Sequence, residues 1–114
     1  MKIEKFEELE SWKLARELTK VLYLVTKKEN FSKDFGLRDQ IQRAAVSIMA
    51  NIAEGFDSRS DKSFINFLNY AYRSATEVQS LLYVALDQKY ISEAEFDNLY
   101  SEIKKIHGFD WWSN

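Results

Sequence analysis

Apolar residues recur every three or four positions along four stretches of this chain, a spacing that predicts four amphipathic α-helices. The first helix is expected at Glu7–Lys28, the second at Asp34–Glu54, the third at Ser60–Lys89, and the fourth from Ser92 onward. The connections between them are short, so consecutive helices should pack as antiparallel neighbours. We therefore expect one all-α domain over residues 1–114, folded as an antiparallel up-down four-helix bundle.

Polar and glycine residues mark the expected helix ends. Ser60 is expected to cap the third helix by accepting a backbone N–H. Ser92 opens a Ser-x-x-Glu capping box at the start of the fourth helix. Asn30 and Gly55 are expected to end the first and second helices.

The second helix is apolar on two opposite sides. Its main stripe, which should face the core, contains Leu37, Ile41, Ala44, Ile48 and Ile52. The opposite side of a surface helix is normally charged, but here it offers Val46, Ala50 and Ala53. Every helix of a lone four-helix bundle has one wet side, so we expect another surface to cover this one.

The third helix also has an apolar stripe beside its core face. It consists of Ile65, Tyr72 and Tyr83, and tyrosine is enriched at protein interfaces. Scattered surface aromatics are the alternative. Together the two helices predict a homo-oligomer whose interface contains Val46, Ala50, Ala53, Ile65, Tyr72 and Tyr83.

A narrow polar strip follows the second helix and contains Gln40, Arg43, Ser47, Asn51 and Glu54. Buried polar groups are costly unless they are paired. Arg43 and Glu54 are too far apart along one helix to pair with each other, so Arg73 and Glu77 on the third helix are their candidate partners. We interpret the strip, with Glu77, as a polar network that fixes the helix register. A ligand or phosphate site and a catalytic role are the alternatives.

Composition excludes several kinds of site. The chain has no cysteine and no proline among its 114 residues, which rules out disulfides, zinc–thiolate and iron–sulfur sites and cysteine nucleophiles. The N-terminus lacks the apolar run of a signal peptide. The longest apolar block, residues 21–25, is too short to span a membrane. We expect a cytoplasmic protein that makes no membrane contact.

Catalytic and cofactor motifs are not evident. The single histidine, His107, lacks the Glu-x-x-His spacing of di-iron bundles, and no glycine-rich loop resembles a phosphate cradle. We expect His107 to be a surface or packing residue. We therefore predict no catalytic residue, no metal site and no cofactor.

Nucleic-acid binding would need a local basic patch, because the formal net charge is −2. The candidate residues are Arg38, Arg43, Arg59, Lys62 and Arg73, with Phe56 and Tyr72 as possible stacking faces. Salt bridges on a solvated surface are the alternative interpretation. A ring of subunits would repeat each charge in every copy and so turn a modest patch into a band.

Three blocks of the sequence resemble one known family. The first block is Leu-Arg-Asp-Gln-Ile-Gln-Arg-Ala-Ala-Val-Ser-Ile at 37–48 followed by Asn-Ile-Ala-Glu-Gly at 51–55. The second is Phe64-x-x-Phe67-Leu68-x-x-Ala71 with Ser74 and Glu77, and the third is Trp12-Lys13-Leu14-Ala15. They resemble the four-helix bundle proteins encoded by intervening sequences of bacterial large-subunit ribosomal RNA genes, and the similarity extends to Tyr90-Ile91.

This resemblance implies a compact bundle assembled as a ring-shaped homopentamer. The chain is also similar to the accessory protein of diversity-generating retroelements, a pentameric barrel that assists a reverse transcriptase and binds nucleic acid. Family members often have proline where this chain has Met49, and a basic residue where it has Asn66. The second difference weakens a phosphate-binding face in this member.

We thus expect a non-catalytic ring that binds RNA or a ribonucleoprotein. The rival is a structural or protein-interaction ring that has no nucleic-acid role, and an enzyme is the third possibility.

Overall fold

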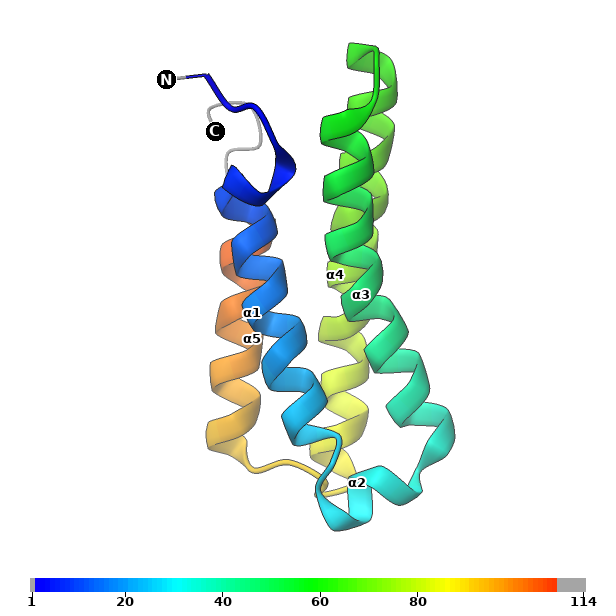
Figure 1. Ribbon diagram of the computed structural model, residues 1–114. Helices are drawn as coiled ribbons and strands as arrows, with labels where there is room; N and C mark the ends of the chain where they lie inside the picture. The colour runs from blue at the N-terminus through cyan, green and yellow to red at the C-terminus, as the bar shows by residue number, and fades with distance from the viewer. Residues whose placement is uncertain (1, 109–114) are drawn as a thin grey trace.

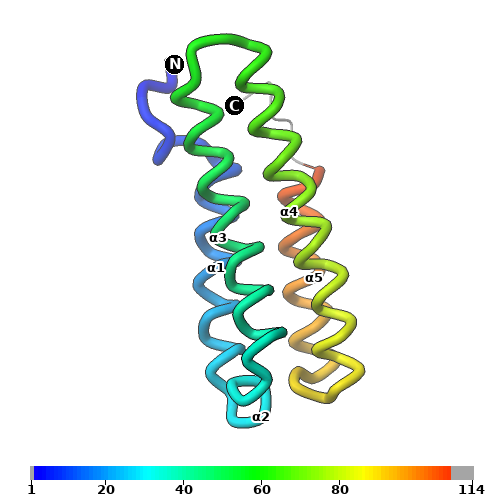
Figure 2. The backbone as a smooth tube through the Cα atoms, turned by 90° about the vertical axis from the view of Figure 1, so that its right-hand side faces the viewer, coloured from blue at the N-terminus to red at the C-terminus, as the bar shows by residue number. Residues whose placement is uncertain are grey.

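The computed structural model describes residues 2–108, which form one short 3-10 helix and five α-helices. These are η1 (Phe6–Glu8), α1 (Glu10–Val25), α2 (Glu29–Lys33), α3 (Phe35–Asp57), α4 (Asp61–Asp87) and α5 (Glu93–His107). The four long helices lie side by side and alternate in direction (Figures 1 and 2). The predicted all-α up-down four-helix bundle is therefore confirmed.

Each long helix packs against two others: α1 and α4 both contact α3 and α5. The predicted core stripes meet at the centre of this arrangement. Among the fully buried side chains are Leu18, Leu22, Ile41, Ile48, Ile52, Val78, Leu82, Leu99, Ile103 and Ile106. Burying one such side chain contributes about 1.5–3 kcal/mol, so this shared core holds the four helices together.

The helices differ in length. With 23 and 27 residues, α3 and α4 are much longer than α1 and α5, which have 16 and 15. At a rise of 1.5 Å per residue, α4 is about 40 Å long and α5 about 22 Å. The α3–α4 hairpin therefore extends beyond α1 and α5 at its tip, where the chain turns through Ser58–Ser60 (Figure 2).

Gly55 does not end α3, which is a correction to the sequence prediction. The helix continues to Asp57, and Ser58 follows it as the C-cap. Gly55 is buried against α4, where an added Cβ would lie 3.0 Å from Cβ of Phe67 and 3.3 Å from Cδ1 of Phe64. The position is glycine because the two helices approach closely there.

Asn30 does not end the first helix either. Helix α1 ends at Val25, and Asn30 lies inside the five-residue helix α2. This short helix places Phe31 in the core with no exposed surface. Five residues are too few to show a helical period, so the sequence pattern gives no sign of α2.

The turn after α4 has a left-handed residue at Lys89, with φ of 62°. The N–H of Lys89 donates to Leu86 O and that of Tyr90 donates to Ala85 O, each at 2.9 Å. This pair of bonds is a Schellman motif, in which a left-handed residue ends a helix and satisfies its last carbonyls. It directs the side chain of Tyr90 back toward the start of α3.

Tyr90 connects this turn to helix α2 and to the start of α3. Its ring stacks on Phe31 with centroids 5.2 Å apart, and its hydroxyl donates to Oδ2 of Asp34 at 3.0 Å. This hydrogen bond raises the pKa of Tyr90. The other carboxylate oxygen of Asp34 accepts the N–H of Leu37 and caps α3. One carboxylate thus holds both the start of α3 and the α4–α5 turn.

Both predicted N-caps are present. The Ser60 hydroxyl accepts the N–H of Ser63 at 3.1 Å, and Ser92 forms the expected capping box with Glu95. Glu95 is also ion-paired with Lys28, which follows α1. The ammonium group of Lys28 lowers the pKa of the Glu95 carboxyl, so the pair links α5 to the α1–α2 connection at the base of the bundle.

Replacing Gly55 with alanine should destabilise the protein by about 1–3 kcal/mol, because the new methyl group would overlap Phe67 across a well-packed seam. The matched control is Gly36→Ala, also in α3, where the nearest atom to an added Cβ is 4.0 Å away. The control should leave stability unchanged or raise it by up to about 1 kcal/mol. Urea unfolding of the two variants measures the difference, and equal stability would contradict a close α3–α4 approach at Gly55.

Candidate interaction surfaces

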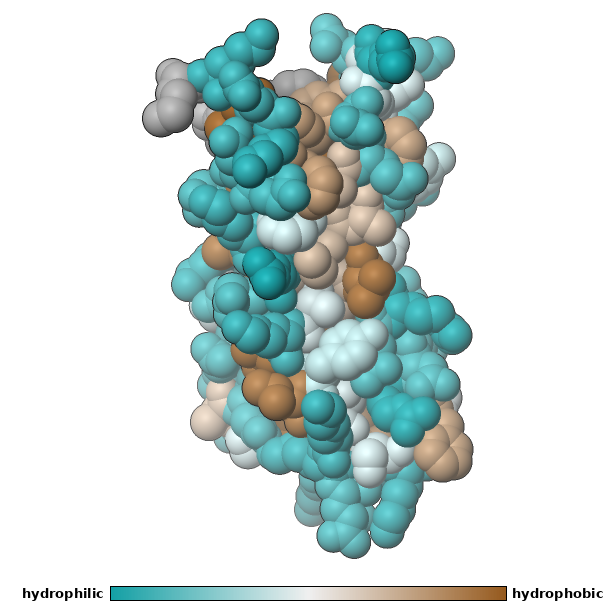
Figure 3. All heavy atoms as spheres, viewed as in Figure 1, coloured by the Kyte–Doolittle hydropathy of each residue, from teal (hydrophilic) through white to brown (hydrophobic). Residues whose placement is uncertain are grey.

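The side of α3 that points away from the core carries Val46, Ala50 and Ala53, which we call the α3 face. Val46 is 43% exposed, Ala50 is exposed and Ala53 is half-buried. Beside Ala53 lies a hollow of about 240 Å³ lined by Phe6, Ala53, Glu54 and Asp57. Figure 3 shows a column of apolar atoms running down this side of the molecule between hydrophilic borders. Phe6 of η1 lies beside Ala53 at one end of this face, whereas Val46 and Ala50 remain exposed in the described protomer.

The tyrosine stripe of α4 does not stand alone, because α5 packs beside it. Tyr83 contacts Phe96 and Tyr100 at centroid distances of 4.9 and 5.9 Å, and the latter two rings stack at 5.3 Å. Nearer the tip, Tyr72 stacks on His107 at 4.1 Å. We call these five residues the α4–α5 face. Tyr72 and Tyr83 remain 47% and 49% exposed.

Ile65, the third residue of the predicted stripe, lies nearer the tip and is 40% exposed. It is seven residues, or about 10 Å, beyond Tyr72, which contacts the last residue of α5. The contribution of α5 to this surface was not predicted. Its signal is the spacing of Phe96, Tyr100 and His107, which places all three on one side of the helix.

A shallow hollow lies on α5 next to these rings. It has a volume of about 450 Å³ and is lined by Phe96, Asp97, Tyr100, Ser101, Lys104 and Lys105. Tyr100, which lines the hollow, forms a hydrogen bond with Tyr83 that raises the pKa of Tyr83. Lys105 pairs with Glu102 at 3.0 Å. Asp97 and Lys104 are exposed, and neither forms an ion pair with any residue in the described range 2–108.

The polar strip of α3 divides into two groups of residues. Ser47 and Ser74 are joined by a 2.9 Å hydrogen bond between their hydroxyls across the α3–α4 seam, and Asn51 donates to Ser47 Oγ at 3.0 Å. Gln40 donates to Glu77 at 3.2 Å across the same seam. These residues hold α3 and α4 in register. Ser74 was not among the residues predicted for this network.

Arg43 and Glu54 form the second group. Both are exposed rather than buried, and neither pairs with Arg73 or Glu77. Arg43 lies at the edge of the α3 face, one turn before Val46. Glu54 lies at the opposite end of that face, beside Ala53. These two charges are therefore available to a molecule that covers the α3 face.

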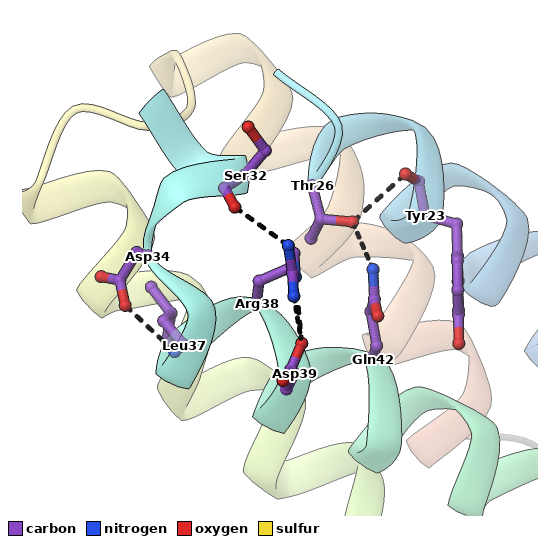
Figure 4. Close-up of polar contacts among 8 residues, drawn as sticks. All are labelled: Tyr23, Thr26, Ser32, Asp34, Leu37, Arg38, Asp39 and Gln42. Atoms are coloured by element: carbon purple, nitrogen blue, oxygen red, sulfur yellow. Dashed lines mark hydrogen bonds and ion pairs between the residues drawn. The ribbon is translucent and has the colours of Figure 1, made fainter. Parts of the chain in front are cut away.

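Arg38 has a structural task. Its guanidinium donates to Ser32 O and to Asp39 at 3.0 Å each (Figure 4). It also lies over the ring of Phe35, 4.9 Å from the ring centroid. It thereby fastens the short helix α2 to the start of α3. In the same corner Gln42 donates to the hydroxyl of Thr26 at 2.9 Å. Arg38 is thus less available to a nucleic acid than the other four basic candidates.

The remaining basic candidates lie at two places. Arg59 and Lys62 flank the tip of the α3–α4 hairpin, whereas Arg73 lies midway along α4, and all three are exposed. The tip is about 20 Å from Arg43 along the helix axis. Of the two proposed stacking residues, Phe56 is half-buried against the core and Tyr72 is stacked on His107. The structure therefore does not gather the predicted nucleic-acid residues into one patch.

His107 packs against α4. Its Nε2 lies 3.2 Å from both Tyr72 O and Thr76 Oγ1.

Across residues 2–108, no group of three or more acidic or histidine side chains is arranged to hold a metal ion. No helix in that range has both the length and the apolar character to cross a bilayer.

Comparison with known proteins identifies a family and finds solved structures that are similar to this chain. A family model described as 23S rRNA-intervening sequence protein matches residues 7–109. A crystal structure of a protein of unknown function from the S23 ribosomal protein family of Bacteroides thetaiotaomicron is 28% identical, with a TM-score of 0.79 over 85% of this chain and 88% of that one. No curated protein matches the chain.

Removing the seam hydroxyl with Ser74→Ala should lower the free energy of unfolding by about 1 kcal/mol, since the half-buried Ser47 loses a hydrogen-bond partner. The adjacent Arg73→Ala is the control. Arg73 is exposed and forms no ion pair with the described residues, so its loss should change stability by less than about 0.5 kcal/mol. Thermal unfolding followed by circular dichroism compares the two. Equal losses would mean that the serine pair does not support the seam.

Proposed function

The chain belongs to the 23S rRNA-intervening sequence protein family, and from this membership and its two exposed apolar faces we propose that it is a non-catalytic homo-oligomeric ring that binds RNA or a ribonucleoprotein. Five subunits are the number that the family resemblance implies. With RNA or a ribonucleoprotein as its partner, the protein would act in the cytoplasm, which is the location we propose. The main support for the ring is that the α3 face and the α4–α5 face are both exposed in a single protomer.

The two faces differ in chemistry, which favours a ring over a symmetric pair. The α3 face is narrow and built from small aliphatic side chains, whereas the α4–α5 face is broad and aromatic. When two copies join through unlike faces, the α3 face of one copy and the α4–α5 face of the other remain free. Further copies can therefore add until the ring closes.

Support for an RNA partner comes from Arg59, Lys62 and Arg73. Their side chains are exposed and pair with no acid in the described part of the chain. The overall charge is −2, so affinity would come from these local charges repeated around the ring. The rival function, a scaffold ring without nucleic acid, is favoured by the separation of Arg73 from the hairpin tip.

The wild-type protein should have a solution mass near five times the 13.5 kDa of one chain by light scattering. Val46→Asp and Tyr72→Asp should each reduce that mass, because each would bury a charge in an apolar interface. Tyr70→Asp is the matched control. Tyr70 is a 52% exposed tyrosine on α4 that belongs to neither face, so this variant should retain the full mass. A monomeric wild type would eliminate the ring.

RNA binding is tested by filter retention of single-stranded RNA across a range of salt concentrations. Affinity should fall steeply as salt rises, since each neutralised phosphate releases counterions. The double variant Arg59→Gln, Lys62→Gln should weaken binding at low salt by about tenfold or more and flatten the salt dependence. The control, Lys13→Gln with Lys20→Gln, removes two lysines that pair on α1 with Glu10 and Glu17. No binding by the wild type even at low salt would favour the scaffold ring.

A further inference from the structure

Two exposed charges, Arg43 and Asp97, lie on different sides of the bundle and have no ion-pair partner among the described residues. Arg43 adjoins the apolar α3 face. Asp97 lines the hollow on α5, next to the ring of Tyr100. A solvated arginine beside an apolar strip and a carboxylate beside an aromatic ring are complementary, because a guanidinium can pair with an acid and lie over a ring at the same time.

The two charges also lie at about the same height along the bundle. Their heights can be compared because both α3 and α5 pack against α1. Thr19 of α1 donates to Ala45 O of α3 at 3.3 Å. On the other side of α1, its neighbour Leu18 lines a groove with Leu99 of α5. Ala45 and Leu99 are therefore level. Arg43 and Asp97 each come two residues earlier on their helices, and α3 and α5 run in the same direction (Figure 1).

The charges along the two surfaces run in opposite order. Going toward the hairpin tip, α3 presents Arg43 first and Glu54 eleven residues later, a separation of about 16 Å. In the same direction α5 presents Asp97 first and Lys104 seven residues later, about 10 Å on. Copies related by rotation about an axis parallel to the bundle keep the same direction. Arg43 on one surface then faces Asp97 on the other at the same level, and Lys104 lies about 6 Å short of the level of Glu54.

We propose that the hollow on α5 receives the α3 face of a second copy of this chain, with Arg43 of that copy lying over Tyr100 and paired with Asp97. At the upper level the long side chain of Lys104 reaches toward Glu54 of the neighbour. This inference rests on the proposed ring and identifies which surfaces meet in it. It also assigns Arg43 to the contact between subunits, leaving RNA to Arg59, Lys62 and Arg73.

This arrangement gives Arg43 an ion-pair partner, which a purely apolar contact would not provide. Covering Val46 and Ala50 with another protein also takes the nearby guanidinium partly out of water, and an unpaired charge in that position is costly. The hollow supplies a carboxylate and an aromatic ring at the level where that cost arises. Because the surfaces that meet are unlike, the contact is head-to-tail and repeats from copy to copy.

Charge reversal tests the pairing in the full-length protein. Arg43→Asp and Asp97→Arg should each place like charges together, weaken association by about tenfold or more, and lower the mass measured by light scattering at micromolar concentration. The double variant restores an opposite-charge pair and should recover most of the wild-type mass. Both residues are exposed, so circular dichroism should show that every variant remains folded.

Lys20→Asp is the matched control, since it reverses an exposed charge on the outer side of α1 and should not alter the mass. If the wild type is oligomeric and both single reversals keep its full mass, the pairing is wrong while the ring stands. Two weakened single variants without recovery in the double variant would also refute the Arg43–Asp97 contact. An Asp97→Arg variant of unchanged mass that binds RNA more tightly would assign the hollow to nucleic acid instead. A monomeric wild type would remove both the ring and this contact.

Discussion

The close approach of α3 to α4 is the constraint on which the rest of the structure depends. Gly55 has no side chain at the point where Phe64 and Phe67 of α4 pack against α3. The hydrogen-bonded hydroxyls of Ser47 and Ser74 lie farther along the same seam. Small residues let the two longest helices approach each other closely, and hydrogen bonds across the seam fix their register. The shorter helices α1 and α5 then complete the core on the remaining side. Both apolar faces keep their positions only because this seam sets the relation of α3 to α4.

Much of the fold follows from periodicity because long amphipathic helices repeat their pattern many times. The stripe of α3 and the caps at Ser60 and Ser92 required no tertiary information. Gly55 was misjudged because a glycine that ends a helix and a glycine that admits a neighbouring helix look alike in one dimension. Helix α2 was missed because five residues hold little more than one turn of pattern.

Surfaces are harder to predict than cores because they combine residues from helices that are distant in the sequence. The pattern of α4 alone showed Tyr72 and Tyr83 but could not show that Phe96 and Tyr100 lie beside them. Charge was misleading for a similar reason. Arg38 looks like Arg43 in the sequence, yet it is committed to Ser32 and Asp39, whereas Arg43 is not paired with any described residue. Whether a charge can bind a partner depends on its neighbours in space.

The unequal helix lengths give the molecule a fixed base and a projecting arm. The base is fastened by the contacts of Tyr90 with Phe31 and Asp34 and by the pair of Lys28 with Glu95. The arm consists of the outer turns of α3 and α4. Related sequences could therefore gain or lose two helical turns in each arm helix, moving the tip by about 10 Å, without rebuilding the base. One scaffold could in this way carry its terminal charges at different distances from the same body.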